Sequence, residues 1–339
     1  MYEYNSLDVF ILFLKKEEYK EFLSDNFIAL RTTEKNLYTS KELVINHFKS
    51  FKKISDIKTQ KEDSHYLVYF SSNNKNYILK AKFDSFGLIE SMVEEIYNES
   101  LNQVVLKLEY DGTNYYGMQK QGNPSYPSIQ GEIEKAIKHM IKKDVIVTIS
   151  SRTDRGVHAK GQVVQFDSNS ISPSQYKYAL NNLLPKDIRI KDAYLRSQLF
   201  NCRYDTVRKE YEYIIDTNEY SVFLKDYVWY TKINNISLIR KELKSLVGTH
   251  DFKAFCKGEN ENTVRTIYEA KVYFRKGKAY FKFIGNGFLH NMIRFIIGSL
   301  IEIDKGSKTT IKDLILEKDK NETSKLAPAS GLYLINIEY

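Results

Sequence analysis

The sequence predicts an α+β fold with more than one compact unit. Runs of β-forming residues alternate with amphipathic helices over residues 104–303, and a hairpin pattern occupies residues 66–83. A hydrophobic fraction of 42% over 339 residues is compatible with ordinary globular cores. Apolar runs stay shorter than the roughly 18 residues that a membrane span requires. The acidic and aromatic start, Met-Tyr-Glu-Tyr, differs from a secretory signal, so we expect a cytoplasmic protein.

Charge is distributed unevenly along the chain. Residues 1–100 hold 14 Lys and Arg against 16 Asp and Glu, a net charge of −2, which leaves 37 against 27, or +10, for residues 101–339. A basic excess favours binding to a polyanion through phosphate contacts and counterion release. Charge alone is equally compatible with a merely soluble surface.

Residues 1–100 are expected to form a small α+β module of unknown role. Helices are expected at residues 9–23 and 42–51, and a hairpin at 66–70 and 77–83 with a polar turn between its strands. Residues 84–89 weakly resemble the last sheet turn of nuclear-transport-factor-2-like domains. A stabilising or partner-binding appendage is the simpler interpretation. We expect the boundary in the polar stretch 97–102, between helix-like and strand-like patterns.

The chain from residue 104 onward has a β-α-β order. Ser128, followed by Glu132, is expected to cap a helix at residues 129–141, because Ser accepts free N–H groups and Glu favours the positive end of the helix dipole. The same pattern predicts strands at 105–110, from 145, at 162–166 and 188–195, with a helix at 172–184. A second α+β half is predicted with strands at 211–215, 264–274 and 278–284 and a helix at 288–303.

A polar loop at residues 150–159, Ser-Ser-Arg-Thr-Asp-Arg-Gly-Val-His-Ala, joins two apolar β-forming runs. Arg152 and Arg155 flank Asp154, and nearby positive charge favours the ionised carboxylate that a nucleophile requires. Gly156 is free to adopt a positive φ. The alternative is a turn aspartate that bonds to its own backbone, and local chemistry leaves both interpretations open.

Five ordered segments carry a family resemblance. They are LEYDGTNYYGMQ at 108–119, RTDRGVHA at 152–159, FNCRY at 200–204 with KEYEYI at 209–214, NGFLHNMIR at 286–294 with GSL at 298–300, and APASGLYL at 327–334. Together they resemble the TruA family of tRNA pseudouridine synthases, and residues 1–100 lie outside the resemblance. The resemblance implies two α+β lobes, 101–205 and 206–339, that share a mixed or antiparallel sheet around a basic cleft.

The resemblance also implies an activity, namely isomerisation of uridine to pseudouridine in the anticodon stem-loop of tRNA by a homodimer. The C1′–N1 bond of uridine breaks, the uracil turns over and C5 bonds to C1′. Nothing is added or lost, so we expect neither cofactor nor metal. The sequence accordingly shows no GxGxxG after a strand, no GxxxxGK[ST], no HExxH and no CxxC.

Four positions match the active site of the family. By resemblance, Asp154 is the nucleophile, Tyr211 packs its ring against the flipped uracil near the C5 proton, and Arg294 pairs with the carboxylate. Arg152 fills the space vacated by the flipped nucleotide or clamps a phosphate. The candidates for substrate contact are Tyr211, Arg155, Lys160, Arg203 and Lys209.

Three residues depart from the family pattern, with Met118 in place of Trp, Ser151 in place of Gly and Arg155 in place of Ala. Ser151 and Arg155 are expected to crowd or charge the loop beside the nucleophile, which affects substrate choice and rate more than fold. The altered loop leaves open a non-catalytic tRNA-binding or folding-assistance protein. Another aspartate-dependent glycosyl-bond enzyme would need a second acid roughly 5 to 10 Å away, and no paired carboxylate motif is visible.

The remaining reactive side chains are expected to be structural. Cys202 and Cys256 lack the spacing of a metal site, so we expect two buried or half-buried thiols. His158 and His290 resemble loop and helix packing residues more than general bases.

Overall fold

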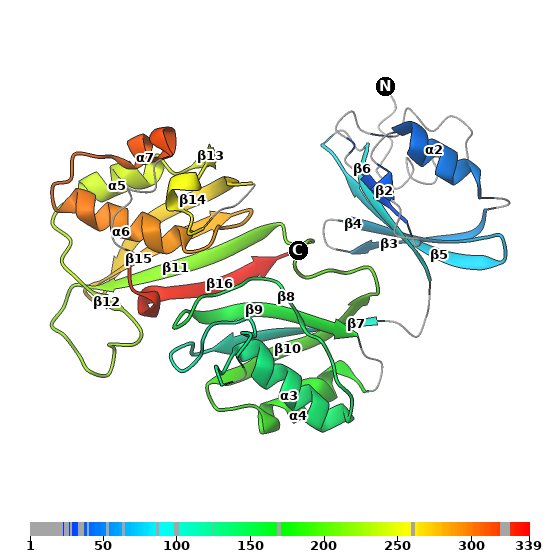
Figure 1. Ribbon diagram of the computed structural model, residues 1–339, viewed down its shortest axis with the longest axis horizontal. Coiled ribbons are helices and arrows are strands. Elements are labelled where there is room, and N and C mark those ends of the chain that lie inside the picture. Colours follow the sequence, from blue (N-terminus) through cyan, green and yellow to red (C-terminus); the bar gives the residue numbers. More distant parts are fainter. Residues whose placement is uncertain are drawn as a thin grey trace. The chain divides into compact units, whose positions relative to one another are not determined.

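The computed structural model describes residues 23, 27, 29–32, 37–38, 41–51, 54–62, 65–85, 88–97, 102–123, 125–167, 171–258, 262–318 and 326–339. The chain divides into two compact units, residues 1–103 with 196–200 and residues 104–195 with 201–339. Both units combine helices and strands (Figure 1), so the α+β class is confirmed. The helix expected at residues 9–23 lies outside the described residues, apart from Leu23.

Unit 1 is built on a six-stranded sheet in the order β2-β1-β6-β5-β4-β3. Its strands are β1 Ala29–Arg31, β2 Leu37–Tyr38, β3 Ser55–Glu62, β4 His65–Ser72, β5 Lys75–Phe83 and β6 Ile89–Ile96. The predicted second helix is α2, Lys41–Lys49. The apolar side of α2, formed by Val44, Ile45 and Phe48, packs into one core with side chains of the sheet. The sheet side chains of this core include Val68, Phe70 and Leu79.

The predicted hairpin of unit 1 is confirmed as β4 and β5. Asn73 and Asn74 form its turn with φ values of 50° and 59°, the positive values that a two-residue type I′ turn requires. The helix-like interpretation of the residues before 97 is wrong, because they form strand β6 against β5. Glu94 of β6 is buried and lies 2.7 Å from Nε2 of His47, so a charged side chain occupies a core-facing position and hides the strand pattern.

The second sheet has ten strands in the order β10-β7-β9-β16-β11-β15-β14-β13, with β8 beside β9 and β12 beside β11. Its strands are β7 Asn102–Tyr110, β8 Thr148–Ile149, β9 His158–Asp167, β10 Ile188–Ser197, β11 Arg208–Asp216, β12 Trp229–Tyr230, β13 Gly248–Asp251, β14 Val264–Arg275, β15 Lys278–Gly285 and β16 Leu332–Glu338. The C-terminal strand β16 is parallel to β9 and antiparallel to β11. One mixed sheet therefore runs through unit 2, as the resemblance implied.

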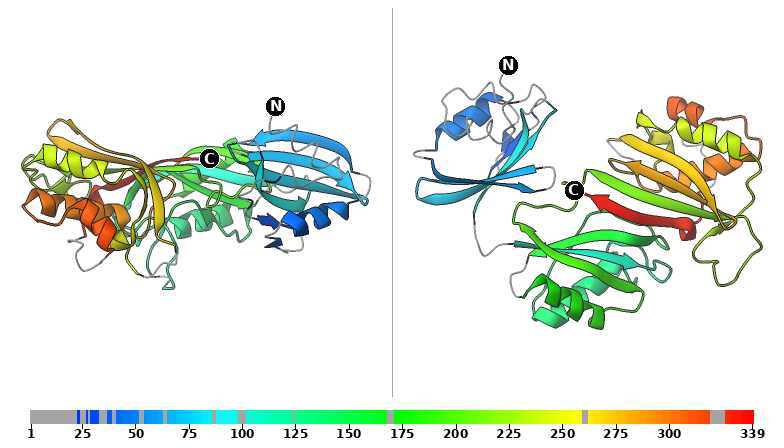
Figure 2. Two further views of the ribbon diagram at one scale, coloured as in Figure 1. Left: turned by 90° about the horizontal axis from the view of Figure 1, so that it is seen from above. Right: turned by 180° about the vertical axis from the view of Figure 1, so that it is seen from behind.

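Helices accompany both ends of this sheet (Figures 1 and 2). They are α3 Ile129–Ile141, α4 Pro173–Leu183, α5 Ile236–Lys244, α6 Met292–Asp304 and α7 Ile311–Glu317, with 3-10 turns η2 Lys253–Phe255 and η3 Ala329–Gly331. α3 has the predicted bounds, and Ser128 Oγ accepts from the N–H of Gly131 as predicted. Residues 145–147 precede the two-residue strand β8 instead of belonging to a longer strand.

The register of the central strands fixes which side chains share a face. Tyr211 of β11 pairs with Leu334 of β16, which pairs with Ala159 of β9. One residue along, Glu212 pairs with Tyr333, which pairs with His158. Successive side chains of a strand point to opposite faces, so Tyr211 lies on one face and His158 on the other.

Candidate active site

The loop that carries Asp154 joins β8 to β9 and is packed against the turn after β7. The backbone N–H of Met118 donates to the carbonyl of Thr153 at 3.1 Å. A Cβ added to Gly117 would lie only 2.6 Å from that carbonyl, and Gly117 has a φ of 93°, so this close approach requires glycine. Met118 is fully buried and keeps the apolar contact expected at this position.

Buried hydrogen bonds hold the loop from inside. The hydroxyl groups of Tyr110 and Thr153 lie 2.7 Å apart, and the amide of Gln162 donates to the carbonyl of Ser151 at 2.7 Å. The N–H of Ser151 in turn donates to the Gln162 side-chain oxygen. Burial raises the pKa of Tyr110 to about 12, so its hydroxyl stays protonated. This satisfied network fixes the backbone on both sides of Arg152.

Two side chains at the start of α6 reach the carboxylate of Asp154. Nη1 of Arg294 donates to Oδ2 at 3.4 Å, and Nε2 of His290 lies 3.3 Å from Oδ1. Arg294 is itself fixed, because it donates to the carbonyl of Ala327 at 2.8 Å and to Oδ1 of Asn291 at 2.9 Å. The Asp154 side chain is 28% exposed, so its carboxylate remains open to a ligand.

The two arginines that flank Asp154 in the sequence make contacts elsewhere. Arg152 is exposed and donates to the side-chain oxygen of Gln119. The Arg155 guanidinium lies 4.3 Å from the centre of the Tyr116 ring, which stacks on Tyr126. The cation placed on Asp154 is therefore Arg294 of α6, which is distant in sequence.

Tyr211 lies behind the loop as a buried member of β11. Its hydroxyl is 2.9 Å from Oγ of Ser151, and its ring meets the ring of Phe288 edge to face at 5.2 Å. Burial raises the pKa of Tyr211, and the charge of Asp154 raises it further. The hydroxyl is therefore held protonated. Ser151 does not crowd the loop, because it is buried and serves as the partner of Tyr211.

Lys209, predicted to contact the substrate, is partly buried at the start of β11. Its ammonium donates to the carbonyl of Ser150 at 2.9 Å. Burial, together with the charges of Arg203 and Arg265, lowers the pKa of Lys209 to about 8. Lys209 thus supports the first residue of the Asp154 loop, and its ammonium is already engaged there.

The other predicted contact residues are dispersed. Arg203 is exposed with its guanidinium over the Tyr204 ring. Lys160 lies on the sheet face opposite Tyr211, two residues after His158, with its ammonium 5.1 Å from the centre of the Tyr333 ring. The structure brings Asp154, Arg294 and Tyr211 to one place and leaves Lys160 outside it.

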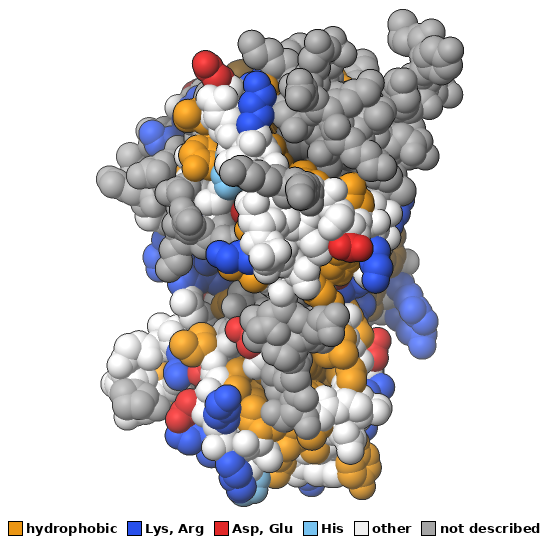
Figure 3. All heavy atoms as spheres, turned by 90° about the vertical axis from the view of Figure 1, so that its right-hand side faces the viewer, with side chains coloured by type: hydrophobic (Ala, Val, Ile, Leu, Met, Phe, Trp, Pro, Cys, Tyr) orange, Lys and Arg blue, Asp and Glu red, His pale blue; other side chains and the backbone are white. Residues whose placement is uncertain are grey.

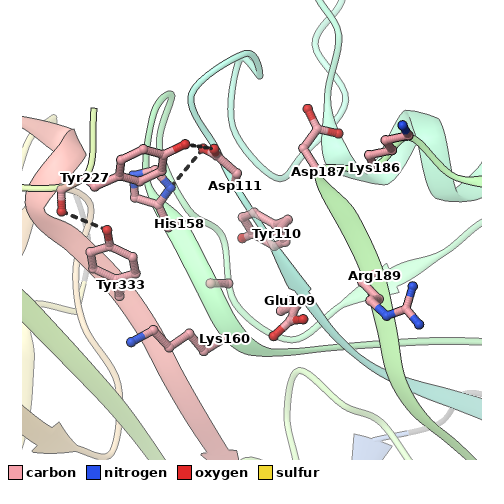
Figure 4. Close-up of a pocket in the computed structure, with 11 residues that line it drawn as sticks. Glu109, Tyr110, Asp111, His158, Lys160, Lys186, Asp187, Arg189, Tyr227 and Tyr333 are labelled. Carbon is pink, nitrogen blue, oxygen red and sulfur yellow. Dashed lines mark hydrogen bonds and ion pairs between the residues drawn. The ribbon is translucent and has the colours of Figure 1, made fainter. Parts of the chain in front are cut away.

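A cavity of about 300 Å³ lies on the sheet face that carries Lys160, and His158 is one of the residues that line it (Figure 4). Nδ1 of His158 accepts from the N–H of Gly112 at 3.2 Å, and Nε2 lies 2.9 Å from the carbonyl of Asp226. Burial lowers the pKa of His158, so the ring is neutral and already bonded at both nitrogens. The ring also stacks on Tyr333. His158 is the packing residue that the sequence predicted.

His290 and Asn291 are the site residues that sequence reasoning missed. His290 was expected to pack, yet its side chain is 53% exposed and faces Asp154. The sequence held one signal, since the helix predicted at 288–303 places His290 and Arg294 four residues apart on one face, although α6 itself begins only at Met292. Cys202 and Cys256 are both buried free thiols, as predicted.

Comparison with known proteins identifies the family of this chain. A family model described as tRNA pseudouridine synthase matches residues 108–205 and 243–339. Those two ranges contain the Asp154 loop and α6. The chain therefore belongs to the tRNA pseudouridine synthase family.

Curated relatives match about two thirds of this chain. A tRNA pseudouridine synthase A from Geobacillus sp. (strain WCH70) is 42% identical over 240 residues, which are 68% of this chain and 96% of that protein. The enzyme of the same name from Exiguobacterium sibiricum is 42% identical over 237 residues, 68% of this chain and 94% of that protein. The one from Bacillus subtilis (strain 168) is 39% identical over 241 residues, 68% of this chain and 97% of that protein.

Two further findings concern membranes and metals. Within the described ranges, no helix is both long and apolar enough to cross a membrane. The same residues contain no group of three His, Cys, Asp or Glu side chains arranged to hold a metal ion.

Proposed function

We propose that this chain converts uridine to pseudouridine in the anticodon arm of tRNA, with Asp154 as the nucleophile. The observation that carries the proposal is the carboxylate of Asp154, partly exposed and held by Arg294 from α6. Membership of the tRNA pseudouridine synthase family supports the substrate class. The reaction conserves every atom of the nucleotide, so the proposed chemistry needs only this chain and the RNA.

The steps follow from the position of the carboxylate. Asp154 bonds to C1′ as the C1′–N1 bond breaks, and the electron pair leaves with the uracil. After the uracil turns over, C5 bonds to C1′ and the carboxylate leaves. Loss of the C5 proton and gain of a proton at N1 complete the isomer. An arginine side chain stays protonated in proteins, so the positive charge of Arg294 accompanies Asp154 throughout.

The other matched residues serve the flipped nucleotide. A target base inside a stacked helix is unreachable, so flipping is required at a cost of a few kcal/mol. Arg152 is exposed beside Asp154 and free of the loop's internal network, which suits it to fill the vacated stack or clamp a phosphate. Tyr211 offers the edge of a fixed ring and a protonated hydroxyl at the back of the site.

Basic and aromatic side chains near the start of β11 support an RNA surface. Arg203 lies over Tyr204 and Arg208 over Tyr268, with centroid distances of 5.5 and 5.2 Å. Such pairs suit phosphates and unstacked bases. On the face drawn in Figure 3, basic side chains (blue) of the described residues lie among apolar ones (orange). We assign the RNA surface by the pairs at Arg203 and Arg208.

The two rival functions predict different chemistry. A non-catalytic tRNA-binding protein would not need a fixed cation on Asp154, yet Arg294 is held there by three hydrogen bonds. A two-carboxylate glycosyl hydrolase would place an acid opposite Asp154. The groups found beside its carboxylate are instead Arg294 and His290.

We also propose a cytoplasmic homodimer with two catalytic lobes, 101–205 and 206–339, and an accessory module at 1–100. Exposed apolar side chains in the β11–β12 loop, Tyr220, Val222 and Phe223, support a protein contact there. Light scattering of the purified chain tests the dimer. A mass of one chain at micromolar concentration contradicts it.

The test of function uses unmodified tRNA without added metal or nucleotide. Wild type and Asp154→Ala are incubated with it, and pseudouridine is mapped base by base. We expect modified uridines in the anticodon arm with wild type and none with the variant, although both bind tRNA. If both bind and neither modifies any of several tRNAs, the binding-protein function replaces this one.

A further inference from the structure

The two carboxylate oxygens of Asp154 have different neighbours, and the inference starts from this difference. Oδ2 faces Arg294, whose side chain is 14% exposed and fixed by Ala327 and Asn291. Oδ1 faces His290, whose side chain is 53% exposed. One oxygen thus has a permanent, buried cation, and the other has an accessible imidazole.

The backbone holds His290 at this place independently of Asp154. The carbonyl of His290 accepts from the N–H of Lys257 at 3.1 Å. Asn291, the N-cap of α6, has a φ of 62°, so the chain turns sharply into the helix directly after His290. Within the described part of the chain, Asp154 is the one polar contact of the His290 side chain. A packing histidine would be buried, and this one is not.

We propose that His290 is a further catalytic residue, whose Nε2–H donates to Oδ1 of Asp154, the oxygen that bonds to C1′. The inference rests on the proposed function, because it assigns a role at the same carboxylate. Catalytic hydrogen bonds are often long in the free enzyme and tighten with substrate, which fits the 3.3 Å separation. Oδ2 then becomes the acyl oxygen, still held by Arg294.

The role of His290 lies in the second half of the reaction. When C5 bonds to C1′, the Oδ1–C1′ bond breaks and its electron pair returns to the carboxylate. A donor at Oδ1 stabilises that developing charge and so speeds departure. His290 gives up no proton in either step, and the atoms balance without another reactant. Loss of the donor therefore leaves the covalent protein–RNA species longer-lived.

The experiment compares His290→Leu and His290→Gln with wild type, Asp154→Ala and His139→Gln, a control on the exposed end of α3. For His290→Leu we expect a kcat lower by roughly tenfold to a hundredfold, an unchanged KM for tRNA, and a covalent adduct visible on a denaturing gel. For His290→Gln we expect partial activity, because the side-chain amide can still donate a hydrogen bond. His139→Gln should match wild type.

The outcomes separate the two proposals. If wild type is active and Asp154→Ala is not, while His290→Leu keeps the wild-type kcat at every pH, His290 has no catalytic role and the proposed function stands. A change in KM alone also overturns the His290 role. If wild type makes no pseudouridine, both proposals fail. Should His290→Leu unfold, His290→Ala is measured in its place, and a wild-type kcat without a covalent adduct in that variant contradicts the inference.

Discussion

Single side chains decide what the Asp154 site can do. The carboxylate meets Arg294 of α6, while the arginines beside it in sequence contact Gln119 and Tyr116. Ser151, which replaces a glycine of the family pattern, binds Tyr211. These contacts could not be derived from the sequence, because neighbours along a loop can point in opposite directions while residues more than a hundred positions apart converge.

A first prediction concerns the hydroxyl pair of Ser151 and Tyr211. Ser151→Ala removes the only hydrogen bond that the described residues give the Tyr211 hydroxyl, which is buried. A buried hydroxyl without a partner costs roughly 1–3 kcal/mol. Chemical denaturation should therefore show that Ser151→Ala lowers the free energy of unfolding by that amount. The double variant Ser151→Ala with Tyr211→Phe, which lacks both hydroxyl groups, should lose less. Equal or additive losses contradict the pairing.

At the scale of elements, sequence periodicity predicted most of the structure. Helix α3 has the predicted bounds because its apolar spacing, its Ser128 cap and its left-handed end at Lys142 agree. β6 was misread because Glu94 occupies a core-facing position beside His47. Helices α5 and α7 and strand β16 were not predicted as elements. β16 owes its central place to pairing with β9 and β11, which sequence periodicity does not encode.

The start of α6 gives a second prediction. Asn291 adopts a φ of 62° and its side chain accepts from Arg294. Asn291→Gly keeps the left-handed backbone without strain but removes the acceptor. We expect its free energy of unfolding, measured by thermal denaturation, to stay within about 1 kcal/mol of the wild-type value. The rate of pseudouridine formation should fall. Asn291→Asp retains an acceptor and serves as the control. Full activity of the glycine variant contradicts a positioning role for Asn291.

The partly buried Lys209 at the start of β11 gives a third prediction. Burial lowers the pKa of Lys209 from 10.5 to about 8. Between those values the unfolded chain binds more protons here than the folded chain, so this residue's contribution to the free energy of unfolding rises with pH. The gain is roughly 3 kcal/mol at most. The measurement is the free energy of unfolding of wild type and of Lys209→Met at about pH 7 and about pH 10. The value for wild type minus the value for the variant should be larger at the higher pH. A constant difference contradicts the assignment.

At the scale of the whole molecule, the synthase sequence contributes a segment to unit 1. Residues 196–200 cluster with residues 1–103. Leu199 packs with Leu67 and Ile78 on the sheet face opposite α2, and Ser197 donates to Glu62 through both its N–H and its hydroxyl. The sequence placed the boundary at residue 100 because a linear pattern cannot show a later segment returning to an earlier sheet.

A fourth prediction follows for unit 1. A fragment of residues 1–103 lacks Leu199 and leaves Glu62 without its partners, so a synthetic peptide of residues 194–202 should bind it and raise its melting temperature. A peptide with Leu199→Asp should not, because it would bury an unpaired charge. Calorimetry of both peptides is the measurement. Equal effects, or none from the native peptide, contradict this account of unit 1.

The most direct test of the central claim is tritium release from tRNA labelled at C5 of its uridines. Isomerisation must release the C5 hydrogen of each converted uridine, so wild type should release label in proportion to the pseudouridine formed. Asp154→Asn keeps the shape of the side chain but lacks the carboxylate charge. It should bind the same tRNA and release no tritium above buffer. Release by Asp154→Asn at a rate near that of wild type would contradict Asp154 as the nucleophile.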